Sequence, residues 1–196
     1  MGKNRLEAFS DGVLAIIITI MVLELKVPAG QGLGDLLPLL PVLLSYVLSF
    51  TYVAIYWNNH HHLLQPVFKV TRPIMWGNLH LLFWLSLLPF ATAWMGANHL
   101  AIVPSVLYGI VLLMAAVSYH WLQWLIIRCG SADPAFKQAI GKDLKGKASI
   151  LIYLAATLTA LKWPSLAQLI YVVLALVWVI PDKRIEENIY SRKSDD

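Results

Sequence analysis

Strongly polar side chains interrupt the long apolar stretches of this sequence at three places. Ser10 and Asp11 lie near the start of the first stretch, the run His60–His62 ends the second, and Asn78 and His80 lie within the third. Inside a membrane, acids and histidines of this kind serve in proton relays, ion pathways and polar contacts between helices. Three histidines in a row also raise the question of a metal site.

The histidine run lacks the spacing of a metal site. His60, His61 and His62 are consecutive, so a helix would point their side chains about 100° apart. Metal-binding helices instead place their ligands on one face, as the two histidines of H-E-x-x-H do. Cys129 is the only cysteine, and no hydrolase motif such as G-x-S-x-G is present. We therefore expect no metal site, no cofactor and no catalytic residue, so the protein is not expected to be an enzyme.

The overall composition predicts an integral membrane protein. Of the 196 residues, 59% are hydrophobic and 13% are charged, and the mean hydropathy is +0.67. Soluble domains are about half apolar and about a quarter charged. The basic residues flank apolar stretches, so they indicate membrane topology rather than binding of nucleic acid. The first apolar stretch has no signal-peptide cleavage pattern and is expected to remain as a membrane span.

Six apolar stretches have the positions of transmembrane helices, which need about 20 residues to cross a bilayer. Six spans place every basic residue except Lys26 and Lys162 on one side, which the positive-inside rule identifies as the cytoplasmic side. The predicted fold class is therefore all-α, one membrane domain over residues 1–196 with both termini in the cytoplasm. The expected helices are 5–28, 37–58, 72–97, 101–128, 147–162 and 164–181.

Features outside these spans give fewer predictions. Pro89 predicts a kink or a break in the third span, and Asp133-Pro134 resembles a helix start in the polar stretch 128–147. The tail from Asp182 is charged and is expected to be loosely ordered. Membrane lipids are the expected partners of the basic polar stretch, through anionic head groups; its lysines are Lys137, Lys142, Lys145 and Lys147.

The polar residues of the first three spans are predicted to meet in one layer. If the second helix runs inward, its last residues lie level with Asp11, and the third helix begins on the same side. Contacts of this kind between membrane helices contribute about 0.6–2 kcal/mol each, enough to fix the rotation of the first helix. The expected network comprises Arg5, Phe9, Ser10, Asp11, Asn58, His60, His61, Trp76, Asn78 and His80.

The first helix also carries a stripe of large aliphatic residues. At about 100° per residue, Ile16, Ile20 and Leu23 lie within an arc of about 60°, and Thr19 flanks them. The residues alone leave this stripe as a surface that faces lipid or packs in the core. A voltage-gated potassium channel is excluded, because the chain has neither a TVGYG-like filter nor an arginine ladder in the fourth span.

Three segments resemble one family of ion channels. Arg5-x-x-x-Phe9-Ser10-Asp11 is similar to the R-x-x-x-F-S-D signature of the transmembrane protein 175 family, and it stands at the start of the first span as in that family. The run from Asn58 to His61 and the stretch from Asn78 to Phe90 are similar to the family as well. With six spans the resemblance covers essentially the whole chain, as one repeat of the kind found in the bacterial branch.

The resemblance implies a potassium channel of the cell membrane. In the family, four subunits assemble so that the first helix of each lines a central pore, gated by large aliphatic side chains instead of a carbonyl filter. The pore positions would fall on Ile16, Ile20 and Leu23, and Thr19 would occupy a position where some bacterial relatives present a hydroxyl ring. The implied partners are three further copies of the chain, membrane lipids, and K⁺ and other monovalent cations as permeating ions.

Two other functions are compatible with the same residues. A proton-coupled transporter would use Asp11 with His60 or His80, since proton relays employ buried acids and histidines. Transporters, however, commonly show paired repeats and broken helices near the bilayer midplane, and we find no convincing internal repeat. In a structural or assembly subunit, all the polar residues would serve only to hold helices together.

Overall fold

The computed structural model describes residues 2–132 and 144–179, and almost all of the regular structure in these ranges is helical. One isolated antiparallel bridge joins Val67 to Ala132. The predicted helix start at Asp133-Pro134, Lys137, Lys142 and the tail from Asp182 lie outside the described residues. The helices are α1 (Lys3–Leu23), η1 (Leu33–Leu39), α2 (Leu40–Leu64), α3 (Arg72–Ser86), α4 (Leu88–Ala97), α5 (Ile102–Arg128), α7 (Leu144–Ala160) and α8 (Pro164–Val179).

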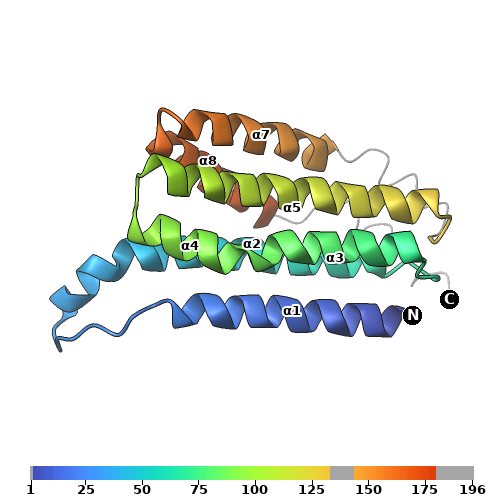
Figure 1. The fold of residues 1–196 in the computed structure, drawn as a ribbon, viewed down its shortest axis with the longest axis horizontal. Helices are drawn as coiled ribbons and strands as arrows, with labels where there is room; N and C mark the ends of the chain where they lie inside the picture. Colours follow the sequence, from blue (N-terminus) through green and yellow to red (C-terminus); the bar gives the residue numbers. More distant parts are fainter. Residues whose placement is uncertain (1, 133–143, 180–196) are drawn as a thin grey trace, which may run out of the picture.

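The helices form a bundle in which successive traverses run in opposite directions, with η1 leading into α2 and α3 continuing into α4 (Figure 1). Helices α3 and α4 together make one traverse of the bundle, because the helix is interrupted only at Leu87. Pro89, at the start of α4, has no N–H to donate to the preceding turn, which accounts for the interruption. Helix α1 packs on α2, α3 and α4, whereas α7 and α8 pack on the far side, against α5.

Within residues 2–132 and 144–179, four helical segments are long and apolar enough to cross a membrane, judged by length and composition. The segments are Lys3–Leu23, Leu33–Leu64, Arg72–Ala97 and Ile102–Arg128. The described parts of α7 and α8 comprise 17 and 16 residues, and the residues before α7 and after α8 lie outside the described ranges. Helix α1 ends at Leu23 instead of residue 28. The chain is therefore an all-α protein with several apolar helices.

The two ends of the bundle differ in charge. Lys3 Nζ donates to the carbonyl of Gln65 at 2.5 Å, and Phe68 N–H donates to the carbonyl of Ser131 at 3.0 Å. The start of α1, the α2–α3 loop and the end of α5 therefore meet at one end, on the right in Figure 1, and α7 begins on the same half of the bundle but short of that end. The described basic residues at this end are Lys3, Arg5, Lys69, Arg72 and Arg128, and Lys145 and Lys147 lie at the start of α7 on the same half of the bundle. We call it the basic end.

Small residues allow close contact between neighbouring helices. A Cβ added at Gly96 would lie 2.8 Å from Cα of Val42, so only glycine lets α4 approach the backbone of α2 at this point. Tyr52, Tyr108 and Tyr171 are among the largest fully buried side chains, and they come from α2, α5 and α8. The core therefore extends from the α1–α4 group of helices into the α5–α8 group.

Candidate functional site

One face of α1 is buried against the rest of the chain. Leu6, Ser10, Leu14, Ile17 and Met21 recur every three or four residues and are all buried. This spacing keeps the side chains on one side of a helix. Contacts with α2, α3 and α4 therefore fix which way the remaining side chains of α1 point.

The predicted aliphatic stripe lies on a different face of α1. The side chains of Ile16, Ile20 and Leu23 are 57%, 44% and 79% exposed in the single chain. Thr19 is exposed too, and its hydroxyl donates to the carbonyl of Ile16 at 2.9 Å. The helix thus presents a continuous aliphatic surface that no other described part of the chain covers.

A buried chain of hydrogen bonds connects α1 to α3 and α2. The amide nitrogen of Asn78 donates to Ser10 Oγ at 2.9 Å, and Ser10 donates to the carbonyl of Leu6 at 2.8 Å. His60 Nε2 lies 2.6 Å from Asn78 Oδ1. Because an amide oxygen only accepts, His60 must be the donor. All three polar side chains are buried, so they are strongly held in these positions.

Asp11 is bound by a residue that the sequence prediction left out. The indole N–H of Trp57 donates to Asp11 Oδ1 at 3.0 Å, and both residues are exposed. The signal was available in the sequence, since Trp57 is three positions before His60 and shares its helix face. Asp11 is therefore bound directly by Trp57 of α2. Its neighbour Ser10 is bound by Asn78 of α3, which in turn bonds to His60 on the same face of α2 as Trp57.

His80 does not join this group. Trp84 Nε1 approaches His80 Nε2 at 3.3 Å, and Ser118 Oγ lies 2.8 Å from His80 Nδ1. An indole nitrogen can only donate, so Nε2 must accept and the proton must be on Nδ1. The ring also meets the edge of Trp121, at a centroid distance of 5.2 Å. His80 therefore links α3 to α5, away from α1.

The remaining predicted network residues lie at the surface of the single chain. Phe9 is 49% exposed and Trp76 is 63% exposed. The side chains of these exposed network residues make no hydrogen bond within the described ranges. The ring of His61 lies beside that of His62, with 5.6 Å between the ring centres. No three His, Cys, Asp or Glu side chains of the described residues are grouped to hold a metal ion. The exposed members are Arg5, Phe9, Asn58, His61 and Trp76.

A second polar cluster near the other end of α1 was not predicted. Thr92 donates to Ser49 Oγ at 2.7 Å, and Ser49 Oγ lies 2.9 Å from the hydroxyl of Tyr108. Met21 Sδ is 3.9 Å from Thr92 Oγ1. The hydroxyl groups connect α2, α4 and α5 beneath the buried face of α1. Single serines and threonines in apolar spans gave too weak a signal to find it.

The fold and the uncovered face of α1 define a helical membrane protein, and comparison with known proteins gives its family. The model of the family described as endosomal/lysosomal potassium channel TMEM175 matches residues 5–89. A potassium channel of Chryseobacterium sp. (strain P1-3) is 54% identical over 189 residues, covering 96% of this chain and 98% of that one. The chain therefore belongs to the TMEM175 family, whose members are ion channels and not enzymes.

A solved structure and a vertebrate relative extend this comparison. The crystal structure of a lysosomal potassium-selective channel TMEM175 homolog from Chamaesiphon minutus matches with a TM-score of 0.76 and 30% identity, covering 91% of this chain and 96% of that chain. The endosomal/lysosomal proton channel TMEM175 of Homo sapiens is 36% identical over 103 residues. That match covers 46% of this chain but 20% of the human protein.

Proposed function

We propose that this chain forms a potassium-selective cation channel in which the α1 helices of four identical subunits surround a central pore. The observation that carries the proposal is the exposed aliphatic stripe of α1, formed by Ile16, Ile20 and Leu23. Relatives that match nearly the whole chain are named potassium channels, which supports the assignment of K⁺ as the permeating ion.

The stripe would act as a hydrophobic gate. Rings of aliphatic side chains that are narrow enough expel water and block ions without any charged plug. A small rotation or outward movement of α1 would rewet the constriction. Because the Thr19 hydroxyl already donates to a backbone carbonyl, it would offer a lone pair to a passing cation. Ile16, Thr19, Ile20 and Leu23 are thus the proposed pore residues.

Selectivity in such a pore would come from hydration. An ion that passes an aliphatic constriction loses part of its water shell, and Na⁺ holds its shell more tightly than K⁺. We therefore propose moderate selectivity for K⁺ over Na⁺, with no carbonyl filter, no metal and no cofactor.

The buried polar contacts would set the rotation of the pore helix. Ser10 is held by Asn78, which His60 holds in turn, and Asp11 is held by Trp57. If α1 turned about its axis, these hydrogen bonds would break and the stripe would leave the pore. Arg5, Phe9, Asn58, His61 and Trp76, which are exposed in one chain, would then meet neighbouring subunits or lipid head groups.

The proposal includes a topology. The chain is a single domain, residues 1–196, with six spans in the cell membrane, and its basic end faces the cytoplasm together with both termini. Anionic lipids of that leaflet would contact Lys145 and Lys147.

Ion flux from liposomes that contain the purified protein tests the proposal. We expect passive K⁺ efflux, slower Na⁺ efflux, and no dependence on a proton gradient. A proton-coupled transporter, working through Asp11 and the buried histidines, would instead require that gradient. A chain that serves only in assembly would give no flux under any gradient.

A further inference from the structure

The α5–α8 side of the bundle contains a cavity that the proposed pore does not use. It has an empty volume of about 420 Å³, including the space at its mouth, and α2, α5, α7 and α8 surround it. Each helix contributes residues from its basic-end half: Asn59 from α2, His120 from α5, Gly146 from α7 and Trp178 from α8. The cavity is therefore next to the basic end.

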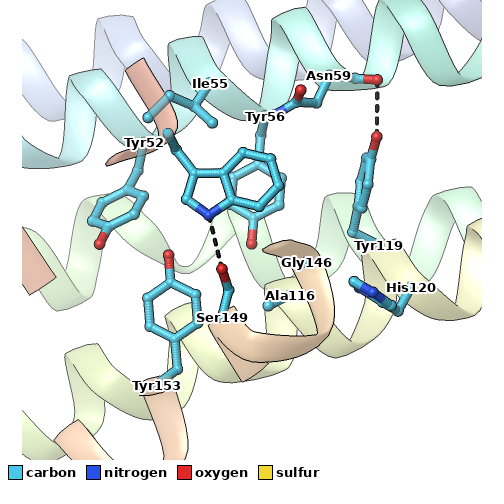
Figure 2. A pocket seen from close by; sticks show the side chains of 11 residues that line it. Tyr52, Ile55, Tyr56, Asn59, Ala116, Tyr119, His120, Gly146, Ser149 and Tyr153 are labelled. Carbon is cyan, nitrogen blue, oxygen red and sulfur yellow. Dashed lines mark hydrogen bonds between the residues drawn. The ribbon is translucent and has the colours of Figure 1, made fainter. Parts of the chain in front are cut away.

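The walls of the cavity are aromatic, and most of their polar atoms are engaged elsewhere (Figure 2). Tyr52 donates its hydroxyl proton to the carbonyl of Tyr171 at 2.6 Å, and Tyr119 donates to the carbonyl of Asn59 at 3.0 Å. The indole N–H of Trp178 donates to Ser149 Oγ at 2.9 Å. Ring carbons therefore dominate the surface that faces the empty space.

Such a space suits a hydrocarbon chain better than water or a polar ligand. A buried water needs two to four polar partners, and Tyr52, Tyr119 and Trp178 already direct their protons to other groups of the protein. If nothing filled the cavity, its lining atoms would forfeit dispersion contacts. In a membrane, the hydrocarbon at hand is a lipid acyl chain.

Positive charge beside the cavity favours an anionic head group. Lys145 Nζ lies 4.6 Å from the centre of the Trp178 ring, directly beside the cavity wall. Lys147 is exposed one position beyond Gly146, which is part of the lining. Juxtamembrane lysines attract anionic lipids. A cationic ligand would be repelled at the same place.

We propose that this cavity binds one acyl chain of an anionic phospholipid, whose phosphate lies near Lys145 and Lys147. The site does not depend on the pore assignment, because it lies on the opposite side of α2 from α1. Residues Tyr52, Tyr56 and Asn59 of α2 line the cavity, whereas Trp57 and His60 of the same helix hold α1 and α3.

Photo-crosslinking of the full-length protein in liposomes tests the site. The probe is phosphatidylglycerol with a diazirine on one acyl chain, and the matched probe is phosphatidylcholine with the same chain. We expect phosphatidylglycerol to label peptides that contain residues 52–59 of α2 and 149–153 of α7, several-fold more than phosphatidylcholine does. Labels confined to the outer face of α8, or equal labelling of the cavity by both probes, would overturn the proposal.

Two pairs of variants separate the cavity from the general lipid surface. Ala116→Phe fills the cavity from α5, and Val117→Phe adds the same ring on the exposed side of that helix. Labelling of residues 52–59 should fall several-fold only in Ala116→Phe. Lys147→Gln should reduce the preference for phosphatidylglycerol, whereas Lys162→Gln at the opposite end should not. This second pair substitutes exposed residues, so it remains decisive if Ala116→Phe does not fold. Unchanged preference in Lys147→Gln contradicts the head-group assignment.

Discussion

The two faces of α1 differ in how far the single chain buries their side chains and bonds their polar groups. On one face, Ser10 is fully buried and bound, and Ile17 is 3% exposed. On the other, Ile16 is 57% exposed although it is the same residue type and the immediate neighbour of Ile17. A helix whose buried side is held this firmly cannot turn its aliphatic stripe inward without losing those contacts. The contrast shows that one face of α1 is fully packed within the single chain, whereas the other face is left exposed to a partner subunit, a pore or lipid.

Substitutions of the adjacent residues Ile16 and Ile17 are the most direct test of the difference between the two faces of α1. Ile16→Asn should leave the fold intact and raise K⁺ leak, because a polar ring holds water in the constriction. We expect a rise of about tenfold, which corresponds to a barrier lower by about 1.4 kcal/mol. Ile17→Asn should instead destabilise the subunit, because it buries an amide without a partner. Flux from liposomes and thermal unfolding in detergent measure the two effects. Unchanged flux in a well-folded Ile16→Asn protein would remove the stripe from the pore.

Substitutions of Gly12 test whether the side of α1 away from its buried face contacts a neighbouring subunit. Ala8, Gly12, Ala15 and Thr19 are small, exposed and spaced by three or four residues, which is typical of helices that approach each other closely in membranes. A Cβ at Gly12 would meet nothing within 4 Å in the single chain. Gly12→Leu should therefore fold but lose tetramers, and Gly12→Ala should keep them. Mass photometry reads the oligomer. Intact Gly12→Leu tetramers would show that this side of α1 is not a subunit contact.

The sequence was sufficient for the faces of α1 because each helix face follows from a period of about 3.6 residues. It also placed Ser10, His60 and Asn78 in one layer, and the structure joins these three residues by hydrogen bonds. It could not separate Asn78 from His80, although two residues along a helix point about 200° apart. Which of the two met α1 depended on how α3 packs between α1 and α5. The cavity was beyond prediction for the same reason, because its walls come from four helices.

Asn78 tests how firmly the buried face is held. Asn78→Leu keeps similar volume but leaves both Ser10 and His60 without their partner. An unsatisfied buried group costs about 1–3 kcal/mol, so the free energy of unfolding should fall by about that amount. Asn98→Leu is the matched control, because Asn98 is exposed and its side chain donates to the carbonyl of Trp94 in the preceding turn. Unfolding in mixed micelles, followed by tryptophan fluorescence, compares them. Equal stability of the two variants would mean that the buried chain contributes little.

Trp57 should show the smallest effect, because its bond to Asp11 is exposed whereas the bonds of Asn78 are buried. Trp57→Phe removes the indole donor and should cost at most about 1 kcal/mol, since exposed partners bond to water instead. Asp11→Asn keeps an acceptor oxygen and separates the hydrogen bond from the charge. If both variants lose ion flux while they remain folded, ion flux depends both on the charge of Asp11 and on the hydrogen bond that Trp57 donates to it. If Trp57→Phe were more destabilising than Asn78→Leu, the exposed end of α1 would have to be held more tightly than its buried face, most plainly by contacts with a neighbouring subunit around Asp11.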